Sequence, residues 1–208
     1  MKTMKKIAFS KRYGLEQAVI ARLKNKTRRI IKGDFEDVKA YHANGCWHFI
    51  ADTKDGDSIE LKPTYEMGET VAIAQSYEDV YLGFSNPQAR HEYSLRVSCL
   101  HHAGDLQAIA GWTNKMFVKS NLMPNRIRIT DIKPKRLQDI SEEDAIREGV
   151  EKWMDGYIVT GIIERWQHHN VCFDTPREAF AALIDKLSGK GTWESNPWVF
   201  DYEFVLLQ

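Results

Sequence analysis

Leu23-Lys24-Asn25-Lys26-Thr27-Arg28-Arg29 is the stretch from which the fold and the function of this chain are best predicted. Five of its seven residues carry a cation or a hydroxyl group. It follows a short apolar run, Ile7-Ala8-Phe9, and a segment with helical spacing from Tyr13 to about Leu23. It leads into Ile30-Ile31, so a cationic stretch stands between two apolar segments.

Lys24, Thr27 and Arg29 are expected to converge, because residues at every second or third position of an extended or turning backbone share a face. An ammonium group whose pKa is lowered by burial and by neighbouring cations, set beside a hydroxyl, is the minimum needed to activate a nucleophile. The same residues would serve as an anion clamp, with an arginine forked onto a phosphate. The stretch therefore indicates a site and leaves two chemistries open.

The pattern K-x-x-T-x-R, from Lys24 to Arg29, resembles the motif of the ASCH domain (activating signal cointegrator homology), a branch of the PUA-like superfamily. The usual motif reads G-x-K-x-x-E-x-R, and here Arg22 replaces the glycine and Thr27 the glutamate. The threonine variant is similar to small bacterial ASCH amidohydrolases, which remove the acetyl group of N4-acetylcytidine with a lysine, a threonine and a glutamate. A later acidic segment, Ile140 to Gly149, supplies a glutamate at Glu148.

Further likeness lies in residues 63–77, in residues 111–132 and from Gly191 to the C-terminus, and longer ASCH proteins of phages and their hosts carry similar stretches. The resemblance implies an α+β protein with a PUA-like fold, a small mixed or antiparallel β-barrel with inserted helices. It implies a single domain over residues 1–208, with insertions at about 42–62 and 78–112.

Hydrophobic periodicity and turn signals point to the same fold class. They predict helices over 13–23, 34–41, 141–149 and 175–187, a partly helical segment within 78–112, and strands over 6–10, 46–51, 58–61, 70–75, 116–119, 126–136, 157–166 and 198–206. Asn86-Pro87 and the capping box at Thr175-Pro176-Arg177-Glu178 are helix-start signals, and Asp55-Gly56 is a hairpin signal. Helices that interrupt short strands exclude a doubly wound parallel sheet.

The resemblance assigns catalytic roles to Lys24, Thr27 and Glu148. Thr27 would attack an amide carbonyl, Lys24 in its neutral form would take the hydroxyl proton, and Glu148 would orient the lysine or shuttle a proton. Arg28 or Arg29 would depress the pKa of Lys24 and hold an oxyanion or a phosphate. The alternative is that these residues are exposed charges at a helix end, with Glu148 on a solvated face.

Two further features suggest nucleic-acid contacts. Trp112, Asn114, Lys115 and Phe117 interleave aromatic and polar residues, which favours base stacking, whereas the other tryptophans are expected in the core. The alternation of residues 126–132 predicts a solvated strand face with two arginines, which suits either an RNA contact or ordinary solubility.

Cysteine and histidine occur together at Cys46-Trp47-His48, at Cys99-Leu100-His101-His102 and at His168-His169-Asn170-Val171-Cys172. None of these is a C-x-x-C pair, and adjacent histidines in a strand point to opposite faces. We therefore predict three reduced cysteines, no metal and no cofactor.

Composition limits the partners. The chain has 208 residues, 43% hydrophobic and 28% charged, with a formal net charge of zero, so any surface for nucleic acid must be local. The first apolar run stops at Phe9, too short for a signal peptide, and no stretch reaches the roughly 18 apolar residues of a membrane helix. We expect a cytoplasmic protein without a membrane partner.

Three functions follow from these observations. The first is a cleft for a nucleobase, nucleoside or RNA segment, with amidohydrolysis of an N4-acylated cytosine as its most specific form. The second is a non-catalytic module that binds single-stranded RNA through the same cations. The third is a phage–host interaction protein that uses residues 78–112.

Overall fold

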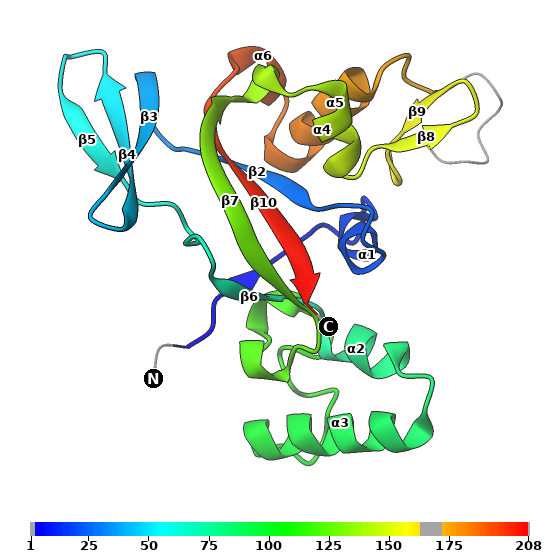
Figure 1. Cartoon of the computed structure of the whole chain (residues 1–208). Coiled ribbons are helices and arrows are strands. Elements are labelled where there is room, and N and C mark those ends of the chain that lie inside the picture. The colour runs from blue at the N-terminus through cyan, green and yellow to red at the C-terminus, as the bar shows by residue number, and fades with distance from the viewer. Residues whose placement is uncertain (1–2, 163–171, 208) are drawn as a thin grey trace. The chain divides into compact units, whose positions relative to one another are not determined.

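The computed structural model describes residues 3–162 and 172–207 (Figure 1). These residues form two compact units. Unit 1 contains the N-terminal residues to Phe9, residues 70–128 and the last residues from Leu206. Unit 2 contains Ser10–Glu69 and Ile129–Val205.

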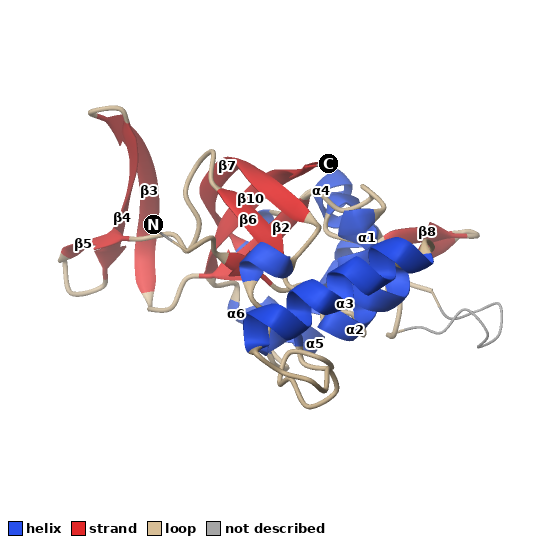
Figure 2. Cartoon of the chain, turned by 90° about the horizontal axis from the view of Figure 1, so that it is seen from below, coloured by secondary structure: helices blue, strands red, loops and turns tan. Residues whose placement is uncertain are grey.

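Unit 1 combines a small sheet with two helices. Strand β1 (Lys6–Ile7) pairs in parallel with β6 (Thr70–Ile73), which pairs antiparallel with the start of β7 (Arg126–Arg136). Helices α2 (Tyr77–Gly83) and α3 (Pro87–His101) lie side by side in both views (Figures 1 and 2). The apolar core between these elements includes Ala72, Tyr77, Tyr93, Val97, Trp112 and Met123.

Side-chain caps start both helices of unit 1. The Ser76 side chain accepts a hydrogen bond from the Asp79 backbone N–H, and the Asn86 side chain accepts one from Gln88. Pro87 then occupies the first turn of α3, where a missing N–H costs nothing. The helix start predicted at Asn86-Pro87 is thus confirmed.

Unit 2 is built on the rest of β7, followed by β10 (Trp198–Leu207) and β2 (Lys26–Ile30) in that order. β10 and β2 are antiparallel, with Tyr202 opposite Thr27. The helices are α1 (Leu15–Ile20), α4 (Glu142–Arg147), α5 (Pro176–Ser188) and α6 (Thr192–Ser195), and a short hairpin joins β8 (Glu151–Trp153) to β9 (Gly156–Ile158). The 3-10 turn η3 (Leu137–Asp139) precedes α4.

A separate three-stranded sheet in unit 2 consists of β3 (Phe35–Ala43), β4 (Cys46–Thr53) and β5 (Ser58–Leu61) (Figure 2). Asn44 and Gly45 join β3 to β4 with φ angles of 51° and 76°. Two successive positive φ angles are the signature of a type I′ turn, whose twist matches that of the flanking strands. The hairpin predicted at Asp55-Gly56 is confirmed between β4 and β5.

Two predicted elements are wrong. Residues 34–41, predicted as helical, form most of β3, because pairing of Val38 with Ala51 and of Ala40 with Phe49 covers one face of the strand. Residues 116–119, predicted as a strand, lie in and after the 3-10 turn η1 (Lys115–Phe117), which precedes η2 (Ser120–Leu122). The Asn114 side chain caps η1 by accepting a hydrogen bond from the Met116 N–H.

The α+β class is confirmed, and the strands predicted at 6–10, 46–51, 58–61, 70–75, 126–136 and 198–206 are present within a few residues. No sheet among the described residues closes into a barrel, because the two outermost strands of each sheet pair with one neighbour only. Part of the predicted strand 157–166 lies outside the described residues. Along the described ranges, no helix has the length and apolarity needed to cross a membrane.

Gly111→Ala should lower the free energy of unfolding by about 1–3 kcal/mol. A Cβ at this position would lie 2.5 Å from the Tyr77 ring. The ring is held in place, because its hydroxyl accepts a hydrogen bond from the Lys119 N–H at 2.8 Å and lies 2.9 Å from His101 Nε2.

The matched control is Gly83→Ala, where an added Cβ meets nothing within 4 Å. It should change stability by less than about 0.5 kcal/mol. Urea unfolding followed by circular dichroism measures both, and equal stabilities of the two variants would refute the packing argument.

Candidate functional site

Strand β2 divides its side chains between two faces. Because successive side chains of a strand point to opposite sides, Lys26 and Arg28 share one face, and Thr27 and Arg29 share the other. Lys24 lies between the end of α1 and the start of β2. The chain reverses there through Arg22, which has a φ of 62°.

The left-handed conformation of Arg22 is informative, because Arg22 stands where the ASCH motif has glycine. Glycine adopts a positive φ without a steric penalty, whereas a residue with a Cβ pays roughly 1–2 kcal/mol. The backbone at this position therefore has the geometry that a glycine would favour, although the residue is an arginine.

Lys24 is buried, with only 2% of its surface exposed. Its ammonium group donates to Lys26 O at 2.6 Å, to Glu148 O at 2.8 Å and to Glu148 Oε2 at 2.5 Å. Burial lowers the pKa of Lys24, the charge and hydrogen bond of Glu148 oppose this shift, and the charges of Arg29 and Arg28 add to it. The site thus holds a buried ammonium whose neutral form is favoured relative to a lysine in water.

Glu148 is also buried, with 4% of its surface exposed, and it links Lys24 to the face of β2 that carries Arg28. Its second carboxylate oxygen accepts a hydrogen bond from Arg28 at 3.2 Å. The Arg28 guanidinium also donates to Asp144 at 3.1 Å and to Asp201 at 3.2 Å. One arginine therefore joins three carboxylates that come from α4, its C-terminal cap and β10.

Lys26 extends the same arrangement. Its ammonium lies 2.9 Å from an oxygen of Asp144 and 2.9 Å from an oxygen of Glu203. Lys135 approaches Asp201 to 3.0 Å, and Arg147 approaches Glu203 to 3.3 Å. We call this set the charged network; its members are Lys24, Lys26, Arg28, Lys135, Arg147, Asp144, Glu148, Asp201 and Glu203.

The charged network is nearly neutral, with five cations and four carboxylates. Lys26 and Arg28 are buried and bound to carboxylates. A phosphate at this face would have to displace those carboxylates at a large desolvation cost. The predicted role of Arg28 in substrate binding is therefore not favoured by its surroundings.

Thr27 lies on the opposite face of β2, next to its cross-strand partner Tyr202. The ring of Tyr202 meets that of Tyr65 edge to face, with centroids 5.5 Å apart. Burial raises the pKa of Tyr65 and brings that of Tyr202 to about 12, and the charge of Arg29 partly opposes both shifts. The charge of Glu69 adds to the rise in the pKa of Tyr65. This face of β2 therefore brings together a hydroxyl, a guanidinium and two phenols.

Sequence reasoning identified Thr27 and Arg29 but missed Tyr65, Glu69 and Tyr202. Tyr65 and Glu69 fall in the segment 63–77, for which a family likeness was noted without roles for individual residues. The sequence signal for Tyr202 is the alternation of residues 198–206, which predicts a strand. Alternation does not show which strand is its neighbour, so it could not place Tyr202 opposite Thr27.

The structure brings Lys24 and Glu148 together as predicted. The Lys24 ammonium donates to the carbonyl oxygen of Lys26, and this carbonyl group is part of the peptide bond between Lys26 and Thr27. The ammonium therefore lies against the peptide bond leading into Thr27. The alternative view, in which Lys24 and Glu148 are exposed charges, is wrong, because both are buried.

The predicted aromatic contacts belong to unit 1. Trp112 is buried in its core, with its ring 5.7 Å from that of Tyr81, so its side chain serves packing there. The Asn114 side chain caps η1, and the Lys115 ammonium donates to Phe9 O. Phe117 is 61% exposed and has the surface that base stacking requires.

Cys46, Cys99 and Cys172 are free thiols at exposed positions. Over residues 3–162 and 172–207, no group of three histidine, cysteine or acidic side chains is placed to hold a metal ion. The histidines at 168 and 169, part of a weighed metal pattern, lie outside these ranges.

Comparison of the chain with models of protein families, with curated proteins and with solved structures gives no match in any of the three. The likeness to the ASCH domain therefore rests on the residues quoted from the sequence.

Glu148→Gln should destabilise the protein by about 3–5 kcal/mol, because it leaves the Lys24 charge buried without a counter-ion. Glu142→Gln, on the exposed side of the same helix, should cost less than about 0.5 kcal/mol. Replacing both partners by apolar residues, Lys24→Met with Glu148→Leu, should recover part of the loss. Urea unfolding measures all three, and a Glu148→Gln protein as stable as Glu142→Gln would disprove the pairing.

Acid should weaken unit 2 through Asp144. Burial alone would raise the pKa of Asp144, but the hydrogen bond and charge of Lys26, with the charge of Arg28, lower it overall. A folded-state pKa below the unfolded value of about 3.9 gives stability that is present above about pH 4 and lost as the pH falls through the folded pKa. Between pH 5 and pH 2, Asp144→Asn should therefore lose less stability than the parent protein, whereas the exposed Glu143→Gln should follow the parent. Identical acid profiles for Asp144→Asn and the parent would count against this role.

Proposed function

We propose that this chain is an ASCH-like protein of the PUA-like fold that binds a nucleobase, a nucleoside or a segment of RNA beside β2. As its most specific activity we propose removal of the acyl group from an N4-acylated cytosine. The observation that carries the proposal is the buried Lys24–Glu148 pair, which lies against the peptide bond leading into Thr27.

The protonation chemistry of the pair suits a general base. Transfer of one proton from Lys24 to Glu148 Oε2, across 2.5 Å, leaves a neutral amine and a neutral carboxyl group. The amine keeps two N–H donors for the carbonyls of Lys26 and Glu148, and the new carboxyl O–H donates to the amine, so every hydrogen bond is retained. Rotation about the Cε–Nζ bond, at the cost of the hydrogen bond from the Glu148 carboxyl group, then turns the amine lone pair to another neighbour.

In the reaction that we propose, Lys24 takes the hydroxyl proton of Thr27 as Thr27 Oγ forms a bond to the acyl carbon. The bond between that carbon and N4 breaks, N4 takes the proton that Lys24 had accepted, and the cytosine leaves with a free amino group. Water then hydrolyses the Thr27 ester and releases the carboxylic acid. Arg29 shares the face of Thr27 and would stabilise the oxyanion.

Two observations support the resemblance on which this proposal depends. Arg22 has a left-handed backbone at the motif's glycine position, so the turn that precedes Lys24 has the form a glycine motif requires. Burial also lowers the pKa of Lys24, which favours the neutral form that a general base needs.

Thr27→Val should abolish acyl release, by at least about a thousandfold, because it removes the nucleophile and keeps the side-chain shape. Thr27→Ser retains a hydroxyl and should keep measurable activity. The parent and both variants would be incubated with a panel of N-acylated nucleosides, and loss of the acyl group would be followed by chromatography. Arg126→Ala, on β7, is the control and should change little. Equal turnover by Thr27→Val and the parent would rule out Thr27 as the nucleophile.

A second candidate, a non-catalytic RNA-binding module, is favoured by the solvated face of β7. Arg126 and Arg128 are exposed there and alternate with buried isoleucines, as the sequence predicted. If these arginines bind phosphate, affinity for single-stranded RNA should fall steeply with salt, and each arginine-to-alanine change should reduce the salt slope. No turnover across the nucleoside panel, with salt-sensitive RNA binding, would select this candidate.

A further inference from the structure

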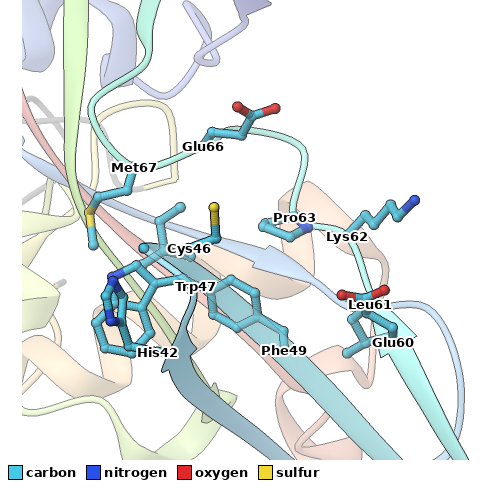
Figure 3. A pocket seen from close by; sticks show the side chains of 12 residues that line it. His42, Cys46, Trp47, Phe49, Glu60, Leu61, Lys62, Pro63, Glu66 and Met67 are labelled. Carbon is cyan, nitrogen blue, oxygen red and sulfur yellow. The ribbon is translucent and has the colours of Figure 1, made fainter.

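A pocket of about 560 Å³ lies within unit 2 (Figure 3). Its lining residues and the members of the charged network are different residues. It lies where β4 meets the connection that follows β5. Its lining combines polar and charged side chains with six large or medium apolar ones: Trp47, Phe49, Leu61, Pro63, Met67 and Ile132. This volume and character are typical of sites for small organic molecules.

The pocket has a fixed floor and an accessible rim. Phe49 is 2% exposed, and its ring meets that of Phe200 edge to face, with centroids 5.2 Å apart. Trp47 is 46% exposed, although its ring and that of His42 meet in a T-shaped arrangement with centroids 5.5 Å apart. The indole is therefore positioned by a neighbour and still has surface for a ligand.

The charges at the rim favour a positive ligand. Two carboxylates, Glu60 and Glu66, line the pocket, and Glu60 lies 3.1 Å from His48 Nδ1. Among the described residues, the ammonium group in the lining is that of Lys62. In Figure 3 the Lys62 ammonium and the Glu66 carboxylate both extend away from the aromatic rings, so both charges lie at the rim. A pocket with an accessible indole and more carboxylates than ammonium groups in its lining attracts cations and disfavours anions.

We propose that this pocket binds an organic cation with a flat apolar body, of the class of N-alkylated heteroaromatic rings. The apolar body would lie against Trp47 and Phe49, and the fixed charge would face the indole, with the carboxylate of Glu66 acting from the rim. A neutral molecule of the same shape would keep the apolar contacts and lose the electrostatic attraction. The proposal does not depend on the chemistry proposed for β2.

Cys46 provides a reporter for binding, because it lines the pocket and is an exposed thiol. Figure 3 shows its sulfur between Glu66 and Trp47 in that view. Cys99 and Cys172 are also exposed thiols and do not line this pocket, so they serve as controls in the same molecule. A bound ligand should slow alkylation of Cys46 alone.

The experiment compares three probes of nearly the same shape: 1-methylnicotinamide (a cation), nicotinamide (neutral) and nicotinate (an anion). Iodoacetamide labelling of each cysteine would be followed by mass spectrometry as probe concentration rises. We expect protection of Cys46 with the cation binding about two- to fivefold tighter than the neutral probe, the anion binding weakest, and Cys99 and Cys172 unchanged. Equal protection by all three probes, a preference for the anion, or no protection of Cys46 would overturn the proposal.

Two variants identify the groups responsible. Trp47→Ala should remove the protection, while Tyr41→Ala, on the opposite face of β3 from His42, should retain it. Glu66→Gln changes an exposed side chain, so the fold is not at risk, and it should bring the affinities of the cation and the neutral probe together. An unchanged cation preference in Glu66→Gln would refute the assigned electrostatic role. Circular dichroism would verify that each variant is folded.

Discussion

A buried ammonium group, that of Lys24, is the constraint on which much of unit 2 depends. A charge without solvent is tolerated only when several acceptors surround it, and here they come from the start of β2 and from Glu148 at the end of α4. Glu148 in turn needs the Arg28 guanidinium, which needs Asp144 and Asp201. The junction of α1 and β2, the end of α4 and the middle of β10 are therefore held by one set of mutually dependent charges.

Local sequence signals predicted the elements whose causes are local. The alternation of residues 126–136 gave β7, and the Thr175 cap followed by Pro176 gave the start of α5, where the Thr175 side chain accepts from the Glu178 N–H. The segment 34–41 was misjudged because its three-residue apolar spacing suits a helix, whereas its partner, β4, lies beyond the Asn44-Gly45 turn. Asn-Gly is a recognised signature of a two-residue hairpin turn, so the sequence does contain a signal that favours paired strands over a helix here.

The candidate site was predictable only in part, for a similar reason. Lys24 and Glu148 are separated by 124 positions, and no periodicity links residues so far apart, so the prediction came from the family resemblance. Nothing in the sequence indicated that the Arg28 guanidinium would form ion pairs with Asp144 and Asp201. Nor did it indicate that the ring of Trp112 would pack against that of Tyr81. Burial of a charged or aromatic side chain is decided by which elements meet, and that information is not local.

The hydrogen bonds of Lys24 also bear on the order in which the chain folds. Two of its three acceptors belong to Glu148, so the contact closes a loop of more than a hundred residues. Closing such a loop is entropically costly, and contacts of long sequence separation slow folding. Until α4 arrives, the ammonium gains more from water than from burial, so we expect the start of β2 to stay solvated after the β3–β4 hairpin, which pairs nearby residues, has formed.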